Sequence, residues 1–259
     1  MTHNDSILES KLYEWIQKTG FPLEMDVASA FRKVEFDVRQ AGIFVDRETN
    51  KGRELDVVAS DPDSFGIIEV SFVIECKASS NPWVVLTSED ALARFNRIFA
   101  FGVLSKDAMA AVVSRQPGKS PWFAKHVSRS DRCGYGLRQA FAGNNDSAYS
   151  AAMSAIKGCH DLARRDLGDI PRLTFTFPVI VIDAPLYECS MDNNGELLLS
   201  AVDESEFLFS ARIPDAVSTC VKIVQRGHLP AFASRMKTLA RDTRIEFAKE
   251  EQDAFGRLI

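Results

Sequence analysis

The sequence predicts an α/β fold in which helices flank a mixed central β-sheet, and two stretches of the chain carry this prediction. Near the start, apolar residues at helical spacing are followed by three segments rich in Val, Ile and Phe. Later, a long helical pattern precedes the continuous apolar run FTFPVIVIDA, which is typical of a strand buried on both faces. A helix followed by such a strand predicts a crossover back onto the sheet.

The composition fits a single domain over residues 1–259. The chain has 259 residues, of which 46% are hydrophobic and 26% charged, which is enough apolar material for one sizeable core. We expect the core of this domain at about 21–78 and 145–184. Residues 79–144 then form an insertion, and residues 185–259 add C-terminal strands and a helix.

Two helices are expected before the first strand. The first runs from Ser6 to Lys18 and is amphipathic, and Gly20 ends it. The second begins at Pro22, because proline is favoured in a first helical turn, and Glu24 falls in that turn. Its apolar residues at helical spacing are expected to be buried: Leu23, Val27, Ala30, Phe31 and Val34.

The segments FDVRQAGIFVD, RELDVVASD and GIIEVSFVIECKA predict a three-stranded antiparallel meander, because the turn sequences TNKG and DPDSFG separate them. Beyond it we expect a helix from Ser88 to Ser105, an irregular stretch from Arg115 to Gly136, and a helix from Asn145 to Asp166. The chain then continues with the buried strand, a hairpin around DNNG, a strand at TCVKIVQ and a helix from about Pro230 to Glu250.

Several classes of protein are disfavoured by the composition. No apolar run reaches the roughly 18 residues of a membrane span, and the polar start MTHNDSILES lacks the layout of a secretory signal, so we expect a cytoplasmic protein. The five cysteines are dispersed, with no CxxC pair and no histidine at zinc-ligand spacing, which favours reduced thiols. The net charge of -5 does not indicate nucleic-acid binding, so any positive surface must be local.

Two neighbouring strands place charged residues in an apolar context. Because side chains alternate along a strand, Val73, Glu75 and Lys77 should share one face of SFVIECKAS. In RELDVVAS the same alternation predicts one face with Leu55, Val57 and Ala59 and the other with Glu54, Asp56 and Val58. A short turn between the strands can bring Asp56 beside Glu75.

Two carboxylates in this setting are costly unless they are paired or bind a cation. Asp56 and Glu75 together make a hard oxygen site suited to Mg²⁺ or Mn²⁺. Lys77 would lie near a water molecule at that site, where it could orient the nucleophile and neutralise charge on phosphate oxygens.

The Asp56 and Glu75-x-Lys77 pattern resembles the PD-(D/E)xK, or restriction-endonuclease-like, nuclease superfamily, although Leu55 stands where the motif has proline. The resemblance implies a restriction-endonuclease-like core and metal-dependent hydrolysis of phosphodiester bonds, with DNA as the expected substrate. It makes Asp56 and Glu75 metal ligands and Lys77 the catalytic lysine. Family members often carry a glutamate on the helix before the meander, which implies a catalytic role for Glu24.

Other interpretations stay open. Asp56, Glu75 and Lys77 could form a structural cross-strand ion pair, and Glu24 could simply complement the helix dipole. The fold could also belong to a catalytically inactive nuclease-like domain that binds nucleic acid or a partner protein, or to an interaction protein, and a homodimer is possible. Arg138 and Gln139 could face substrate, but two such residues beside a helix start are more often surface residues.

A basic segment provides a candidate nucleic-acid surface. Residues 115–132 contain five basic side chains and one acid, Asp131, in an otherwise acidic chain, and Trp122 and Phe123 are interleaved with them. Basic and aromatic residues together can hold phosphates and stack on bases, whereas the plainer interpretation is a solvated loop. The candidate contact residues are Arg115, Lys119, Trp122, Lys125, Arg129 and Arg132.

Overall fold

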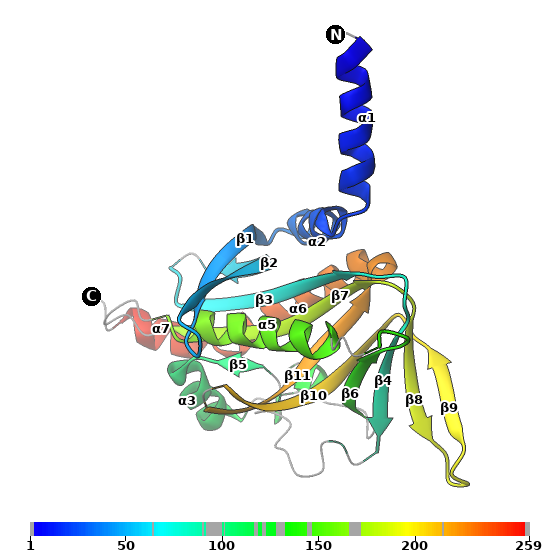
Figure 1. Cartoon of the computed structure of the whole chain (residues 1–259). Helices are drawn as coiled ribbons and strands as arrows, with labels where there is room; N and C mark the ends of the chain where they lie inside the picture. The colour runs from blue at the N-terminus through cyan, green and yellow to red at the C-terminus, as the bar shows by residue number, and fades with distance from the viewer. Residues whose placement is uncertain are drawn as a thin grey trace.

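The computed structural model describes residues 3–63, 65–89, 91, 100, 102–116, 119–120, 123–127, 133–143, 147–165, 172–213 and 215–256. These residues form a mixed α/β structure around one 11-stranded sheet (Figure 1). The helices are α1 (His3–Gln17), α2 (Phe21–Lys33), α3 (Lys106–Arg115), α4 (Ala124–Val127), α5 (Ser147–Ala163), α6 (Leu229–Glu246) and α7 (Ala248–Phe255), with a 3₁₀ turn, η2, at Arg226–His228.

The strands follow the order β1-β2-β3-β7-β11-β10-β6-β4-β8-β9 across the sheet, and β5 pairs with β7 off this path. Their bounds are β1 (Asp37–Asp46), β2 (Lys51–Pro62), β3 (Ile68–Ala78), β4 (Trp83–Ser88), β5 (Val103–Leu104), β6 (Cys133–Gln139), β7 (Leu173–Asp183), β8 (Leu186–Met191), β9 (Leu197–Ala201), β10 (Glu204–Ile213) and β11 (Asp215–Gln225).

The predicted meander and crossover are both present. Strands β1, β2 and β3 are antiparallel neighbours, and β7 pairs with β3 in parallel, with Glu75 opposite Ile180. Helix α5 precedes β7 and packs on both β7 and β3. Every residue of β7 up to Ile182 is buried, as the continuous apolar run predicts.

Helices cover both faces of the sheet. One large apolar cluster joins α2, α3, α6 and α7 to one face, where Phe31, Phe72 and Phe177 pack together. On the other face α5 contacts two clusters, one of which contains Val73 and Cys159. The central strands β3 and β7 are therefore buried between α5 and the group made by α2 and α6.

The segment 79–144 is more regular than its sequence indicates. It contributes β4, β5, α3, α4 and β6, and β4 and β6 pair with each other inside the sheet. The helix predicted from Ser88 to Ser105 is wrong at both ends, since Ser88 ends β4 and Val103–Leu104 is a strand; residues 90, 92–99 and 101 lie outside the described residues. Cross-strand pairing decided these short segments, because their local pattern is weak.

Helix α1 forms where its spacing predicts, but it projects away from the body of the molecule (Figure 1). Its apolar residues stay exposed, with Leu8 at 59% and Trp15 at 58% of their full accessibility. Trp15 contacts the ring of Phe21 at the junction with α2. Among the described helices, none is both long enough and apolar enough to cross a membrane.

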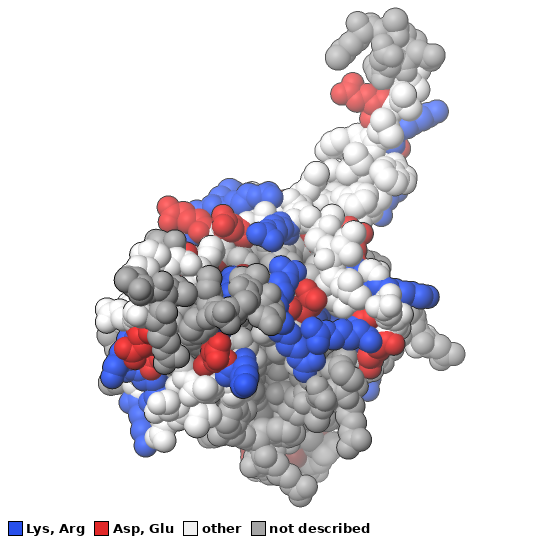
Figure 2. Space-filling view, turned by 90° about the vertical axis from the view of Figure 1, so that its left-hand side faces the viewer, with Lys and Arg blue, Asp and Glu red and all other residues white. Residues whose placement is uncertain are grey.

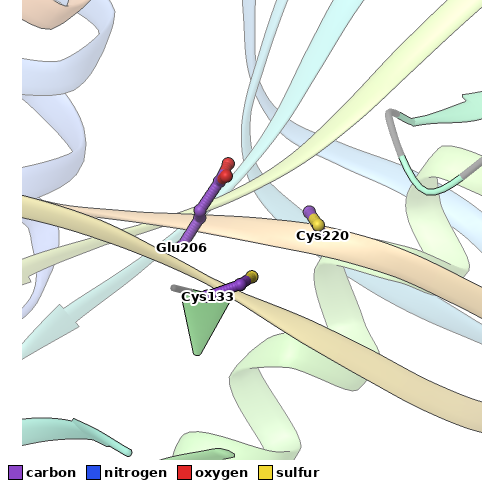
Figure 3. Close-up of side chains that lie close together, drawn as sticks. All are labelled: Cys133, Glu206 and Cys220. Carbon is purple, nitrogen blue, oxygen red and sulfur yellow. The ribbon is translucent and has the colours of Figure 1, made fainter. Parts of the chain in front are cut away.

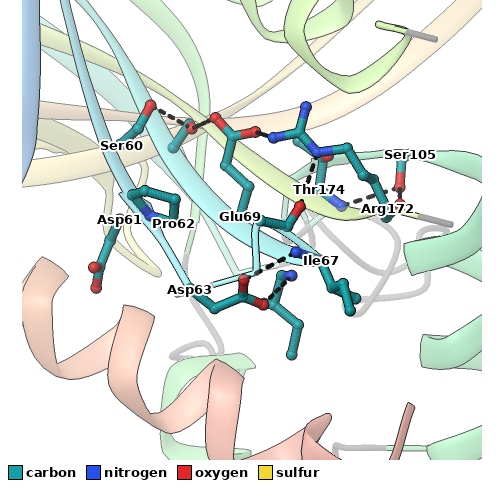
Figure 4. A network of polar contacts seen from close by, with 12 residues as sticks. Ser60, Asp61, Pro62, Asp63, Ile67, Glu69, Ser105, Arg172 and Thr174 are labelled. Atoms are coloured by element: carbon teal, nitrogen blue, oxygen red, sulfur yellow. Dashed lines mark hydrogen bonds and ion pairs between the residues drawn. The ribbon is translucent and has the colours of Figure 1, made fainter. Parts of the chain in front are cut away.

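A polar network fixes the far end of the β2–β3 hairpin (Figure 4). Asp63 accepts hydrogen bonds from the backbone N–H groups of Ile67 and Ile68 and so closes the turn. Arg172, just before β7, forms an ion pair of 2.5 Å with Glu69 and accepts a hydrogen bond at its carbonyl from Ser105. The start of β7 and the start of α3 are therefore held to the same end of the hairpin.

Candidate metal and catalytic site

The pairing of β2 with β3 brings Asp56 and Glu75 together. Val57 lies opposite Ile74, and these are the last paired residues before the two strands separate. The next step of the same register places Asp56 opposite Glu75. Asp56 and Glu75 therefore lie opposite each other at a fork in the sheet.

The fork is held by a hydrogen bond from backbone to side chain. The Cys76 N–H donates to Oδ2 of Asp56 at 2.7 Å, where a ladder partner from β2 would otherwise be expected. Across β2, Ala41 of β1 has a left-handed φ of 52° between the pairs Gln40–Val57 and Gly42–Leu55. The two strands on either side of β2, namely β1 and β3, therefore both depart from regular pairing next to Asp56.

The predicted facing of β2 is wrong at one position. Leu55 packs with Val58 and Val73 in the cluster beneath α5, whereas Val57 and Ala59 belong to the cluster on the α2 side. Strict alternation would have put Leu55 with Val57. The change of facing falls at Asp56, which lies where the strand leaves its partner, and Asp56 is accordingly only half-buried.

Glu75 and Lys77 extend from the same strand and form an ion pair. Glu75 is 8% exposed, and its Oε1 accepts from Nζ of Lys77 at 2.7 Å. Ser154 of α5 also hydrogen bonds to Glu75. The single ammonium group of Lys77 thus lies beside the carboxylates of both Asp56 and Glu75. When both acids are ionised, Lys77 alone does not balance their negative charge.

Glu24 joins this group from α2. Its pKa is raised, first by burial and then by the charges of Asp56, Glu54 and Glu75, and Lys77 opposes this rise. Glu24 therefore lies within electrostatic reach of the other acids. Glu54 is exposed but lies close enough to act on both Glu24 and Asp56, a role that the sequence did not single out.

Asp56 and Glu75 also have raised pKa values. For Asp56 burial is the largest cause, and the hydrogen bond from Cys76 and the charge of Lys77 act against it. For Glu75 burial is followed by the charge of Asp56, while Lys77 and Ser154 act in the opposite direction. Burial also raises the pKa of the Cys76 thiol, and the three carboxylates around it raise it further.

This arrangement has the chemistry of a divalent-cation site. Three acids with raised pKa values lie within mutual electrostatic reach, and Lys77 is the lysine that, among the described residues, opposes the rise in all three. Carboxylate oxygens on rigid strands suit Mg²⁺ or Mn²⁺, which lower the cost of keeping such groups ionised. Asp56 and Glu75 are the residues that could hold the cation, with Glu24 beside them.

Polar residues that the sequence did not single out line the same end of the sheet. Arg226 of η2 forms ion pairs with Asp26 of α2 and, at 2.7 Å, with Asp183 of β7, which lies opposite Ala78. No local pattern marks Arg226, because its two partners are distant in sequence.

Gln139 is placed next to this end of β3. It donates to Oγ of Ser79 at 2.5 Å and accepts from Ser147, so it joins β3 to β6 and α5. Arg138 is exposed and donates to the carbonyl of Leu137. Of this pair only Gln139 is near the site, and its described contacts are structural.

The described residues of the basic segment lie away from this site. Arg115 pairs with Glu250 at 2.7 Å, Lys125 pairs with the buried Asp242 at 2.9 Å, and Lys119 is exposed. Trp122, Arg129 and Arg132 lie outside the described residues. On the face that carries α3 and α7, Figure 2 shows basic side chains interspersed with acidic ones.

The distance from the basic segment to the site follows from the strand register. Arg115 and Leu173 line one groove, and Leu173 lies opposite Ile68 at the start of β3. Ile68 and Glu75 are roughly 23 Å apart along the strand, at about 3.3 Å per residue. Arg115 therefore lies at the other end of β3, a position that no local sequence pattern could predict.

Comparison of the chain with protein-family models, with curated proteins and with solved structures found no match.

Proposed function

We propose that the chain is a metal-dependent nuclease of the PD-(D/E)xK type that hydrolyses phosphodiester bonds in DNA. The observation that carries this proposal is the meeting of Asp56, Glu75 and Lys77 at the fork between β2 and β3, with Glu24 alongside. Acids with raised pKa values beside one lysine, at a strand end, are more typical of a reactive site than of a packed core.

The order of elements supports a restriction-endonuclease-like core. A helix, an antiparallel meander, a second helix and a strand returning parallel to the meander correspond to α2, β1–β3, α5 and β7. In this proposal residues 79–144 are the insertion that separates the two parts of the core. Its strands β4 and β6 extend the sheet and leave the site at the end of β3 in place.

The site residues would divide the chemistry between them. Asp56 and Glu75 would hold Mg²⁺ or Mn²⁺, which would supply positive charge beside the reacting phosphate. Lys77 donates hydrogen bonds to the attacking water and to a phosphate oxygen as negative charge grows there. The water oxygen bonds to phosphorus and gives up a proton to solvent, the bond to the leaving sugar oxygen breaks, and that oxygen takes up a proton from solvent.

Cleavage assays test the proposal. Purified protein is incubated with Mg²⁺ or Mn²⁺ and with plasmid, linear duplex, single-stranded DNA and RNA. We expect cation-dependent cleavage of DNA that Asp56→Ala abolishes, while Lys33→Ala, which removes an exposed lysine at the end of α2, leaves it intact. Cation-independent cleavage, or equal activity in Asp56→Ala, contradicts the proposal.

One observation favours a second function, binding without cleavage. The ion pair of 2.7 Å between Lys77 and Glu75 satisfies both groups, as a purely structural pair would. A nuclease-like domain of this kind would bind nucleic acid without turnover. Absence of cleavage on every substrate, with binding retained, would make this the better account.

A further inference from the structure

A second group of side chains that could bind a metal lies in the part of the sheet formed by β6, β10 and β11. Cys133 of β6, Glu206 of β10 and Cys220 of β11 place their two sulfur atoms and a carboxylate oxygen within 4.8 Å of one another. Figure 3 shows the three side chains gathered where these neighbouring strands run side by side. Both cysteines are buried and Glu206 is half-buried.

We propose that Cys133, Glu206 and Cys220 form a zinc site. Thiolate sulfur is a preferred ligand of Zn²⁺, and with Zn–S bonds of about 2.3 Å two sulfurs of a tetrahedral site lie about 3.8 Å apart. A cluster within 4.8 Å reaches that geometry with a shift of about 1 Å or less. The mixed ligand set selects Zn²⁺ over Mg²⁺, which is bound by oxygen ligands.

Two of the three side chains, Cys133 and Glu206, line a cavity. The cavity has a volume of about 340 Å³ and is bounded on its far side by Phe232, Arg235 and Met236 of α6. With zinc bound, this space could admit a water molecule as the fourth ligand, as in zinc sites with three protein ligands.

The charges around the site suit a bound dication. Two thiolates and the Glu206 carboxylate carry a formal charge of about −3, and Zn²⁺ leaves about −1. Lys222 lies 3.2 Å from Glu206 and neutralises that remainder. Lys222 also lines the cavity, so the compensating charge lies beside the ligands.

The site lies where two parts of the sheet are least firmly joined. Among the described residues, β10 and β6 share a single pair, Phe207 with Gly134, whereas the β10–β11 ladder continues from Glu204 to Ile213. A Cβ on Gly134 would lie 2.6 Å from the Glu206 carbonyl oxygen, so only glycine allows this approach. A cation bound to Cys133, Glu206 and Cys220 would connect β6 to β10 and β11 at this junction.

The two proposed metal sites lie on opposite faces and use different ligands. Lys222 is paired with Val179, which belongs to the apolar cluster on the α6 side, whereas Glu75 contacts Ser154 of α5. Glu206 therefore faces α6, and Glu75 faces α5. Failure of one site leaves the other testable.

The experiment uses Co²⁺ as a spectroscopic probe for Zn²⁺ on the full chain under reducing conditions. We expect a thiolate-to-metal charge-transfer band that saturates at one sulfur-bound Co²⁺ per chain and that Zn²⁺ abolishes by displacement; Co²⁺ bound by the carboxylates of Asp56 and Glu75 gives no such band. Cys220→Ser should weaken binding by more than about 100-fold, because loss of even an outer-shell partner costs about 10- to 100-fold. Cys189→Ser, which removes the half-buried thiol of β8, should leave the band unchanged.

A second variant and a thiol count separate the site from a folding defect and from a disulfide. Glu206→Gln keeps both buried cysteines and should weaken Co²⁺ binding while the circular dichroism spectrum stays unchanged. Zn²⁺ should protect two thiols from alkylation and slow amide exchange in β6. No thiolate band in wild type, equal binding in Glu206→Gln, or a Cys133–Cys220 disulfide in the reduced preparation would overturn the proposal.

Discussion

The backbone N–H of Cys76 donates a hydrogen bond of 2.7 Å to Oδ2 of Asp56, so the strand that carries Glu75 and Lys77 also orients the aspartate of the neighbouring strand. Asp56 takes the place of a backbone acceptor just where β2 leaves β3. The relative position of the two carboxylates is therefore set by β3 itself. Rigid placement of this kind reduces the cost of organising a cation site.

We predict that Asp56→Asn keeps the fork but loses the cation. The amide oxygen can still accept from the Cys76 N–H, whereas its neutral charge weakens attraction for a divalent cation. Mn²⁺ affinity measured by calorimetry should fall by about 100-fold or more, which corresponds to about 2.7 kcal/mol. Glu54→Gln serves as the control, because this exposed acid lies nearby and should change affinity far less.

We predict that Lys77→Ala separates catalysis from cation binding. Removing the lysine takes away a hydrogen-bond donor from the transition state and should lower the cleavage rate by about 10²- to 10³-fold. Mn²⁺ should bind at least as tightly, because Glu75 loses the ammonium group that competes with the cation. Single-turnover cleavage and calorimetry measure the two effects. Cleavage at the wild-type rate would remove Lys77 from the mechanism.

The raised pKa values predict that these three acids lower the free energy of unfolding of the metal-free protein as pH rises. The folded state holds the protons of Glu24, Asp56 and Glu75 more tightly than the unfolded chain does. Stability from this source is therefore lost as pH increases from about 4 through the raised pKa values. Urea unfolding in EDTA at several pH values should show that, as pH rises over this range, the free energy of unfolding of Asp56→Asn increases relative to that of wild type.

Mn²⁺ should restore the stability that wild type loses as pH rises, because a bound cation favours the ionised carboxylates. The same Mn²⁺ concentration should leave the stability of Asp56→Asn unchanged. A stability gap between the two proteins that does not change with pH would show that Asp56 is ionised at no cost in the folded state.

The basic segment can be tested with two lysines in different settings. Each phosphate contact that is lost should reduce the slope of log affinity against log salt by roughly 0.9 on duplex DNA. We predict that Lys119→Ala produces such a change, since this lysine is exposed. Lys125→Ala should change the slope less, because Lys125 is paired with Asp242, whose buried carboxyl is held at a pKa of about 2 by His126 and Lys125 despite its burial.

Binding isotherms in Ca²⁺ across a salt series measure both slopes. An unchanged slope in Lys119→Ala would show that DNA does not reach this end of the molecule, about 20 Å along the sheet from Glu75.

The convergence of the acids could be predicted because it depends on short-range rules. Alternation along β3 and a short turn after β2 are enough to bring Asp56 to Glu75, and helical spacing is enough to place Glu24 on α2. The strand β7 was predictable for a similar reason, since burial on both faces gives an unbroken apolar run.

The remaining features depend on partners that are distant in sequence. Leu55 changes face because β2 separates from β3 at the next residue, and no propensity scale encodes that separation. Cys133 and Cys220 approach each other only through the neighbouring strands β6, β10 and β11, so ligand spacing along the chain could not reveal them. Exposure of Leu8 and Trp15 on α1 is likewise decided by where the body of the protein lies.

The parallel pairing of β3 with β7 also has a kinetic consequence. The hairpin that carries Asp56 and Glu75 is local, but β7, which flanks Glu75 on its other side, reaches it only after about a hundred intervening residues, and closing so long a loop is slow. During synthesis the acids would therefore be adjacent yet still hydrated before β7 and α5 are in place. Their pKa values should rise only late in folding, so capacity to bind a cation tightly should be among the last properties the chain acquires.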